Sequence, residues 1–240
     1  MKSLLVVLAL SLSVVSFGQT LKIAPVVGVN ATSVMNSDDI KDIYDELEDY
    51  DIKWKHRPAL KGTFGAWVDY EANEKLGFRT GLLLDFKGEV MKIKYKEDDE
   101  SIKAKLRMKY TYLELPLMVT YKIGDNGFKL LAGPSINFAI SAKGTSSYRY
   151  EYDGDVDKGS ETENYKIGSD PDKHDIKPID LSFNLGLAKE IEVKDRPLEV
   201  SLMVSPSLTK YTTITKDEPD YFSRHFAIGF KVAYFFSIGD

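Results

Sequence analysis

Alternation between apolar and polar residues runs through most of this chain and restricts its fold more than any other feature. A repeat of two residues predicts β-strands, because successive side chains on a strand point to opposite faces of the sheet. The alternation predicts eight strands, over residues 22–32, 61–70, 76–90, 111–122, 128–142, 179–188, 198–204 and 226–236. Long helical stripes are nearly absent, so the sequence predicts an all-β fold.

The segments between these strands alternate in length. Short links fall near residues 71–75, 124–127 and 190–196, whereas long polar connections cover residues 33–57, 93–105, 143–177 and 210–221. Short turns at one end and long external loops at the other are typical of barrels in an outer membrane. Most of the strands reach the roughly 9–11 residues that cross a bilayer. We therefore predict an eight-stranded antiparallel up-and-down transmembrane β-barrel.

The composition is compatible with this prediction although it resembles that of a soluble protein. The mean hydropathy is −0.26 and 29% of the residues are charged, but only every second residue of a membrane strand has to meet lipid. The net charge of −5 argues against a nucleic-acid partner, which requires a basic face. The chain contains no cysteine, which excludes disulfides, thiolate metal sites and a cysteine nucleophile.

The first eighteen residues have the features of a secretory signal peptide. Lys2 precedes an apolar stretch over Leu4–Val15, and the small residues Ser16 and Gly18 lie before a cleavage point at Gln19. We predict a signal peptide over residues 1–18 and an outer-membrane barrel domain over residues 19–240.

Charged residues recur in mid-strand on the face opposite to the apolar one. They are Arg79, Asp85, Glu114, Lys129, Asp180 and Lys231. Charges on this face indicate a small hydrated lumen, and we predict a polar network there. An eight-stranded barrel has an interior just filled by side chains, so we expect no general porin. A secreted lipocalin-like ligand-binding barrel, with its apolar face inward, has the same alternation and stays as the alternative.

Four prolines fall inside predicted strands, namely Pro25, Pro116, Pro134 and Pro206. Each removes a hydrogen-bond donor from the sheet, and a closed barrel has no free edge for them. We therefore expect β-bulges at these positions.

One strand carries a motif that resembles a known family. The motif consists of Tyr112, Leu113, Glu114, Leu115, Pro116 and Leu117, followed by Tyr121. It is similar to a strand of the PorT-like outer-membrane barrels of Bacteroidota, and the stretch Ala132–Ser135 resembles the Gly-Pro segment of that family. The resemblance implies an eight-stranded outer-membrane barrel. The founding member assists a secretion system, but no residue here carries that role over.

One segment has the residue spacing of a metal site. Asp153, Asp155 and Asp157 have the 1, 3, 5 spacing of a calcium loop, but Lys158 and Asn164 replace its glycine and glutamate. They form a weak calcium candidate, and a solvated loop is the simpler interpretation. We predict no other metal and no cofactor.

The three histidines, His56, His174 and His225, are expected near the external side. A histidine at the rim could activate a nucleophile in a lipid- or peptide-modifying barrel enzyme, but no nucleophile elbow is present. No two of the histidines have zinc-ligand spacing either. We therefore predict that the protein is not an enzyme.

A short amphipathic helix is expected in the first external loop, with Ile40, Ile43, Tyr44 and Leu47 on one face. In the loop at 143–177, Tyr148, Tyr150 and Tyr152 alternate with charged residues and suggest a hairpin beyond the membrane. The sequence thus predicts a monomer in outer-membrane lipid with a structural or interaction role. Its acidic external loops would meet a protein, a surface polymer or a cation.

Overall fold

The computed structural model describes residues 20–36, 42, 46–47, 50–97, 100–213 and 223–238. Within these residues all of the regular structure apart from a few helical positions near residue 46 is β-strand. The strands are β1 (Thr20–Asn36), β2 (Lys53–Glu71), β3 (Leu76–Glu97), β4 (Glu100–Ile123), β5 (Phe128–Tyr152), β6 (Asp155–Asn164), β7 (Ile179–Val193), β8 (Arg196–Pro206), β9 (Ser223–Tyr234) and β10 (Phe236–Ile238).

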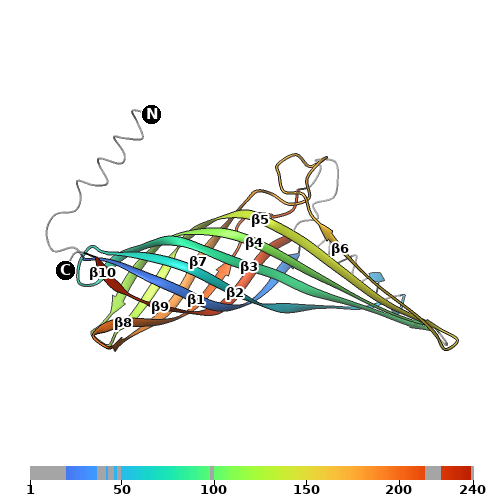
Figure 1. Ribbon diagram of the computed structural model, residues 1–240, viewed down its shortest axis with the longest axis horizontal. Coiled ribbons are helices and arrows are strands. Elements are labelled where there is room, and N and C mark those ends of the chain that lie inside the picture. The colour runs from blue at the N-terminus through green and yellow to red at the C-terminus, as the bar shows by residue number, and fades with distance from the viewer. Residues whose placement is uncertain are drawn as a thin grey trace.

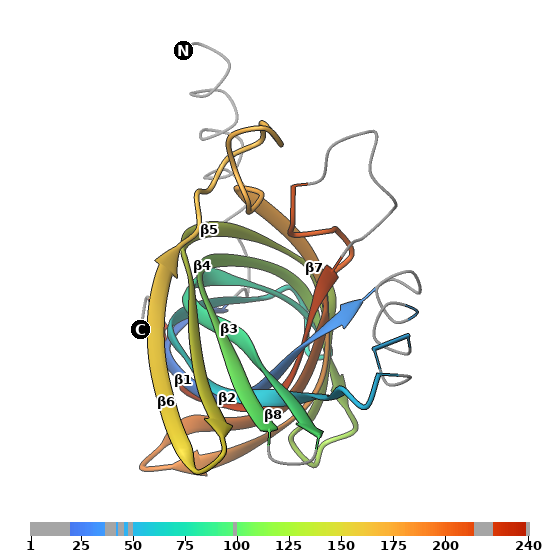
Figure 2. The same ribbon diagram turned by 90° about the vertical axis from the view of Figure 1, so that its right-hand side faces the viewer.

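Eight of the strands form a closed antiparallel ring (Figures 1 and 2). Each pairs with its neighbour in the order β1-β2-β3-β4-β5-β7-β8-β9, and β1 closes the ring against β9 from Val26↔Ala233 to Asn36↔Ser223. β6 lies outside the ring and pairs only with β5, and β10 continues β9 along the start of β1. The predicted eight-stranded antiparallel barrel is therefore confirmed. No helix in the described part of the chain is long and apolar enough to cross a membrane.

The short connections lie at one end of the barrel, where β1 begins and β10 ends. They consist of residues 72–75, 124–127 and 194–195. Lys194 and Asp195 both have positive φ, at 52° and 60°, as a two-residue type I′ hairpin requires. We call this the short-turn end and the opposite end the external end.

At the external end the strands continue far beyond the ring (Figure 1). β3, β4 and β5 contain 22, 24 and 25 residues, whereas about 9–11 residues span a membrane. These extensions, with β6 and the start of β2, form what we call the external sheet, which consists of residues 53–57, 88–97, 100–109, 143–152 and 155–164. The β5–β6 hairpin matches the hairpin expected from Tyr148, Tyr150 and Tyr152.

The long polar connection predicted over residues 93–105 is not a loop. Those residues belong to β3 and β4, which pair without a break in register from Leu83↔Glu114 to Glu97↔Glu100. The polar character of this segment hid its alternation, because basic residues occupy one face from Lys103 to Lys109 while apolar side chains occupy the other.

The expected bulges at the four prolines were also wrong. Register shifts occur instead in the β2–β3 pair between Pro58 and Thr63, and in the β4–β5 pair between Thr111 and Tyr112. At Pro116 the ladder lapses for two residues but resumes in the same register. Gly133 helps here, since a side chain at this position would stand 2.1 Å from the carbonyl oxygen of Leu117. The backbones therefore approach closely where the proline donates no hydrogen bond.

The apolar face of the barrel points outward. The exposed fraction is 78% for Leu60, 62% for Val27 and 55% for Leu185. The apolar residues inside form a plug near the short-turn end, made of Trp67, Leu83, Leu131, Met203 and Phe235 with smaller neighbours. Outward apolar side chains fit a lipid environment and overturn the secreted lipocalin-like alternative, in which the apolar face would line the cavity.

Two predictions concern segments that lie outside the described residues. The signal peptide over residues 1–18 is one of them. The amphipathic helix is the other, because Ile40, Ile43 and Tyr44 are not described. Both stay predictions.

Candidate functional site: a filled lumen and a basic external sheet

Arg79 is the centre of a charged cluster in the lumen near the short-turn end. Its side chain is fully buried, and its guanidinium forms paired hydrogen bonds with Asp69, at 2.6 and 2.7 Å, and with Glu199, at 2.6 and 2.9 Å. The guanidinium also lies 4.3 Å from the Trp67 ring centre. Lys129 lies 3.4 Å from Glu199 and also pairs with Glu190. Such a network joins β2, β3, β5 and β8 across the barrel.

A second cluster occupies the middle of the lumen. Lys231 lies 3.8 Å from Glu114, and Lys87 lies 3.5 Å from Asp180. Amide and hydroxyl groups complete the network, because Asn30 donates to Asp85 at 3.1 Å and Ser135 donates to Glu114 at 2.9 Å. The buried charges are thus paired or hydrogen-bonded, as burial requires.

Aromatic rings close the lumen toward the external end. His225 stacks on Tyr211 with ring centres 4.0 Å apart, and its Nε2 is 3.0 Å from the hydroxyl oxygen of Tyr112. Tyr110 packs edge-on against the same histidine. Ile176 is buried in this cluster and belongs to the connection between β6 and β7, so the external connections contribute to the closure.

Little free space remains between these clusters. The residual cavity of the central network has a volume of about 10 Å³ and is bordered by Asp85, Glu114, Asn137 and Lys231 among others. A single water needs roughly this much room. The described lumen is therefore filled by side chains.

The external sheet differs on its two faces. Residues paired directly across antiparallel strands share a face, and the register joins Lys53, Lys94, Lys103, Arg149 and Lys158 in one row. This face continues the lipid-facing side of the barrel, and we call it the basic face. Its charged residues are Lys53, Lys55, Arg57, Lys92, Lys94, Lys96, Lys103, Lys105, Arg107, Lys109, Lys143, Arg149, Lys158 and Glu151.

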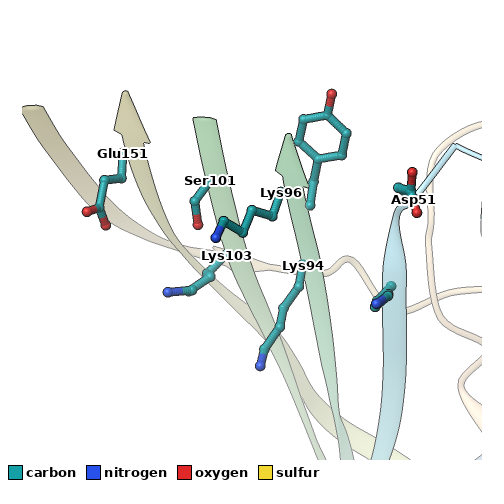
Figure 3. Close-up of a pocket in the computed structure, with 8 residues that line it drawn as sticks. Asp51, Lys94, Lys96, Ser101, Lys103 and Glu151 are labelled. Atoms are coloured by element: carbon teal, nitrogen blue, oxygen red, sulfur yellow. The ribbon is translucent and has the colours of Figure 1, made fainter. Parts of the chain in front are cut away.

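A pocket of about 390 Å³ lies at the tip of the basic face (Figure 3). Lys94, Lys96 and Lys103 border it on neighbouring strands, with Asp51 and Glu151 at its edges. The cations of this face influence one another. The pKa of Lys92 is lowered, first by the positive charge of Arg57 and to a smaller extent by partial loss of hydration and by Lys105.

The opposite face of the external sheet continues the lumen side of the barrel. It carries apolar and aromatic residues on β3 and β4, with tyrosines on β5 and carboxylates on β6. These residues include Ile93, Tyr95, Ile102, Leu106, Met108, Tyr148, Tyr150, Asp157 and Glu161. Tyr148 donates a hydrogen bond to Asp157 at 3.3 Å, and the neighbouring carboxylate raises the pKa of that phenol.

All six residues predicted for the lumen network lie inside the barrel and are at most 5% exposed. Sequence reasoning missed Asp69, Lys87, Glu199 and His225 as members of the interior clusters. Asp69, Lys87 and Glu199 occupy polar-face positions of the predicted strands, so the alternation of polar and apolar residues could have identified them. His225 was expected at the rim, but it is 1% exposed and enclosed by aromatic rings.

The strand motif at residues 112–117 has a simple structural basis. Tyr112, Glu114 and Pro116 are buried on the lumen side, whereas Leu117 is 47% exposed on the outside. Glu114 accepts hydrogen bonds from Ser135 and Asn184. The alternation of the motif therefore places leucines toward lipid and hydrogen-bonding groups toward the interior.

The weak calcium candidate is not supported. Asp153 lies in the tight β5–β6 turn with a φ of 48°, and Asp155 and Asp157 pair with tyrosines of β5. Among the described residues, no group of three or more histidine or carboxylate side chains is placed to hold a metal ion.

The histidines are dispersed. His56 forms an ion pair with Glu89 at 2.9 Å, and His174 lies 3.2 Å from the backbone oxygen of Asp170. The hydroxyl of Ser223 donates to Asn36 and not to His225. Among the described residues, the observed hydrogen bonds join neither the His174 ring nor the His225 ring to a serine side chain.

A closed ring with an apolar outer face and a polar, filled interior defines an integral membrane β-barrel. Residues 17–213 match the family model for the outer membrane protein beta-barrel domain. This chain belongs to that family, and it is an outer-membrane protein. A comparison with curated protein sequences gave no match.

Three solved structures of outer-membrane or surface proteins match most of this chain, at low sequence identity and low TM-score. The attachment invasion locus protein Ail of Yersinia pestis, in complex with the heparin analogue sucrose octasulfate, is 11% identical, with a TM-score of 0.34 over 90% of this chain and 99% of that chain. Neisserial surface protein A is 10% identical, with a TM-score of 0.31 over 90% of this chain and 98% of that chain. OprG of Pseudomonas aeruginosa is 10% identical, with a TM-score of 0.27 over 93% of this chain and 97% of that chain.

Proposed function

We propose that this protein is an interaction protein of the outer membrane, which presents the external sheet to a partner and does not act as a general porin. The observation that carries the proposal is the contrast between the two ends of the same strands. The central network of the lumen leaves a cavity of about 10 Å³, whereas β3, β4 and β5 continue well beyond the ring with two chemically distinct faces.

The expectation of acidic external loops needs refinement. In the described part of the external end, positive charge is concentrated on the basic face, and negative charge lies on the opposite face of β6 and near its turn. The proposed interaction role therefore rests on the separation of positive and negative charge between the two faces of the external sheet. A partner could distinguish the two faces by electrostatic complementarity.

The interaction role is tested by shortening the external sheet. Met91 pairs with Leu106, so replacing residues 92–105 by an Asn-Gly turn leaves the strand ends correctly placed for a hairpin. We expect this variant to fold in the outer membrane but to lose co-purifying surface components. An unchanged set of components would contradict the proposal. The matched control alters the short-turn end, where Lys194-Asp195 is replaced by Asn-Gly.

The closed lumen is tested by conductance in planar bilayers. We expect the full chain to show no stable ion current, because the Arg79 cluster, the central network and the His225 ring cluster follow one another along the lumen. A steady ohmic current from the folded protein would contradict this part of the proposal.

Three finer assignments belong to the same proposal. We propose a monomer, a non-enzymatic role, and membership of the PorT-like branch, on the strength of the Tyr112–Leu117 motif. The variants His174→Ala and His225→Ala test the second of these. Both are expected to leave cell-envelope phenotypes unchanged when the protein is folded, and a loss shared by both would favour an enzyme.

A further inference from the structure

We infer that the lower edge of the basic face is a binding site for anionic phospholipids of the surrounding leaflet, whose headgroups carry a net negative charge. This inference deepens the proposed function and rests on it, because it names a ligand class for the external sheet. The site lies where the basic face meets the lipid-facing belt of the barrel, between β2, β3, β4 and β5.

A pocket of about 470 Å³ marks this boundary. Leu60 and Phe86 are among its apolar lining residues, and Lys61, Lys109 and Lys143 also line it. Lys109 and Lys143 are directly paired across β4 and β5. Lys61 bends over the outer face of β3, since a side chain added at Gly88 would stand 3.0 Å from its Cε. Gly88 thus leaves room for the third lysine beside the other two.

Apolar and cationic groups meet in this pocket in the order that a lipid requires. Leu60 is 78% exposed on the outer face of β2, where it can contact acyl chains. Phe86 lies two residues nearer the short-turn end than Gly88, which pairs with Lys109, so the paired Lys109 and Lys143 lie on the external side of this ring, where an anionic headgroup would lie. A basic residue near a membrane surface contributes roughly a factor of five in affinity for anionic lipid.

The rows above the pocket extend the positive charge away from the membrane. Lys94, Lys103 and Arg149 follow one another on three adjacent strands, as do Lys92 and Lys105 one step closer to the barrel. Like charges placed directly opposite one another destabilise a sheet. Anionic groups bound between these side chains would offset that repulsion.

Protection of a sheet edge is a weaker explanation for the lysines. Lysines protect exposed edge strands against pairing with other chains, but β3 and β4 are paired on both sides within the external sheet. A solubilising surface would intersperse both signs of charge. On the basic face, Arg149 with Glu151 at 3.1 Å is the ion pair found among the described residues.

A membrane lipid fits the pocket better than a soluble polyanion does. The pocket opens on the lipid-facing side of the barrel and includes side chains of the apolar belt, which a soluble sulfated or phosphorylated polymer would not bury. A second copy of the chain would bring lysines against lysines on the same face. The occupant that satisfies both the apolar and the cationic lining is an anionic lipid.

The experiment uses the full mature chain folded in non-ionic detergent and measures retained lipid by native mass spectrometry. Dioleoyl phosphatidylglycerol is compared with dioleoyl phosphatidylcholine, which has the same acyl chains. The test variant combines Lys61→Gln, Lys109→Gln and Lys143→Gln. A matched control with the same change in charge combines Lys166→Gln, Lys173→Gln and Lys177→Gln in the connection between β6 and β7.

We expect the unmodified chain to bind phosphatidylglycerol with at least tenfold higher affinity than phosphatidylcholine. The test variant should lose about 10- to 100-fold in affinity for that lipid, and the control should keep the preference. Heat-modifiable gel mobility establishes that each variant is folded. Equal retention of the two lipids, or an unchanged preference in the folded test variant, overturns the inference.

Two further arms separate the other occupants. A heparin oligosaccharide is titrated against the chain, the test variant and a variant with Lys94→Gln, Lys103→Gln and Arg149→Gln. If heparin binding depends on these lysines while the chain shows no preference for phosphatidylglycerol, the occupant is a soluble polyanion and the inference fails. If the folded test variant loses the preference for phosphatidylglycerol but retains the same co-purifying components, the lipid site is distinct from the surface that binds those components.

Discussion

The barrel wall and the external sheet are built from the same strands, yet they place opposite chemistry on the same face. On β3 the outward side chains Phe78, Leu82 and Leu84 give way to Lys92 and Lys94, without an interruption of the strand. On the inward side the order is reversed, because the charged residues Asp85 and Lys87 are followed by Met91 and Ile93. The polarity of the inner face therefore inverts between Glu89 and Met91, and that of the outer face between Val90 and Lys92.

The inversion shows that the solvent, and not the strand geometry, determines the sequence of each face. Within the bilayer the outer face meets hydrocarbon, where a charge is costly. Above the bilayer the same face meets water and headgroups, where lysines are tolerated. On β4 the change falls between Leu113 and Lys109, next to the change on β3. We infer that the hydrocarbon layer ends near this inversion, because charged side chains avoid hydrocarbon.

The largest effect that tests this comparison is expected inside the barrel wall. Arg79→Met leaves the buried carboxylates of Asp69 and Glu199 without their main partner, and removing one member of a buried ion pair costs about 3–5 kcal/mol. We expect the free energy of unfolding in urea and detergent to fall by this amount. The combined variant Arg79→Met, Asp69→Asn, Glu199→Gln should recover a large part of it. A single variant as stable as the unmodified chain would contradict the network.

The next effect compares the outer faces of the two regions directly. Leu117→Lys introduces a charge into the lipid-facing belt of β4, where a cation near the midplane costs about 2–4 kcal/mol. The measurement is the unfolding free energy in vesicles. If Leu117→Lys lowers the unfolding free energy by less than about 0.5 kcal/mol, Leu117 does not lie in the lipid-facing belt.

A smaller effect is expected in the aromatic cluster near the level where the polarity inverts. Tyr112→Phe removes the hydrogen bond of 3.0 Å to Nε2 of His225 but keeps the ring. Loss of one buried hydrogen bond costs about 1–2 kcal/mol, again measured by urea unfolding. Tyr150→Phe is the control, since Tyr150 lies on the external sheet away from this cluster. Equal losses in the two variants would argue against a specific role for the hydrogen bond.

The smallest effect is expected on the basic face. Lys103→Leu is the reverse of the Leu117 change on the same strand, and surface substitutions usually change stability by less than about 0.5 kcal/mol. We expect unfolding to be unaffected, because Lys103 is exposed and forms no ion pair within the described part of the chain. A loss above 1 kcal/mol would mean that the lysines of this face stabilise the fold itself.

The sequence predicted the barrel wall well and the external sheet poorly, for one physical reason. In the wall, leucines that face lipid alternate with buried charged residues such as Glu114. This contrast in polarity is plain from the sequence. In the external sheet, Ile102, Lys103, Ala104 and Lys105 alternate equally strictly, but the many charges make the segment resemble a loop. Alternation placed Arg79 in the lumen, but the pairing of Arg79 with Glu199 and of Tyr112 with His225 could not be foreseen, because each joins strands that are distant in sequence.

Ring closure has a consequence for assembly of the protein. The closing pair joins the two ends of the chain, with Leu21 opposite Ile238 and Asn36 opposite Ser223. Until the last strand has been made and paired, the apolar edge of β1 stays open to other chains. Contacts so far apart in the sequence form slowly. The edge of β1 is therefore open to pairing with other chains until β9 and β10 close the ring.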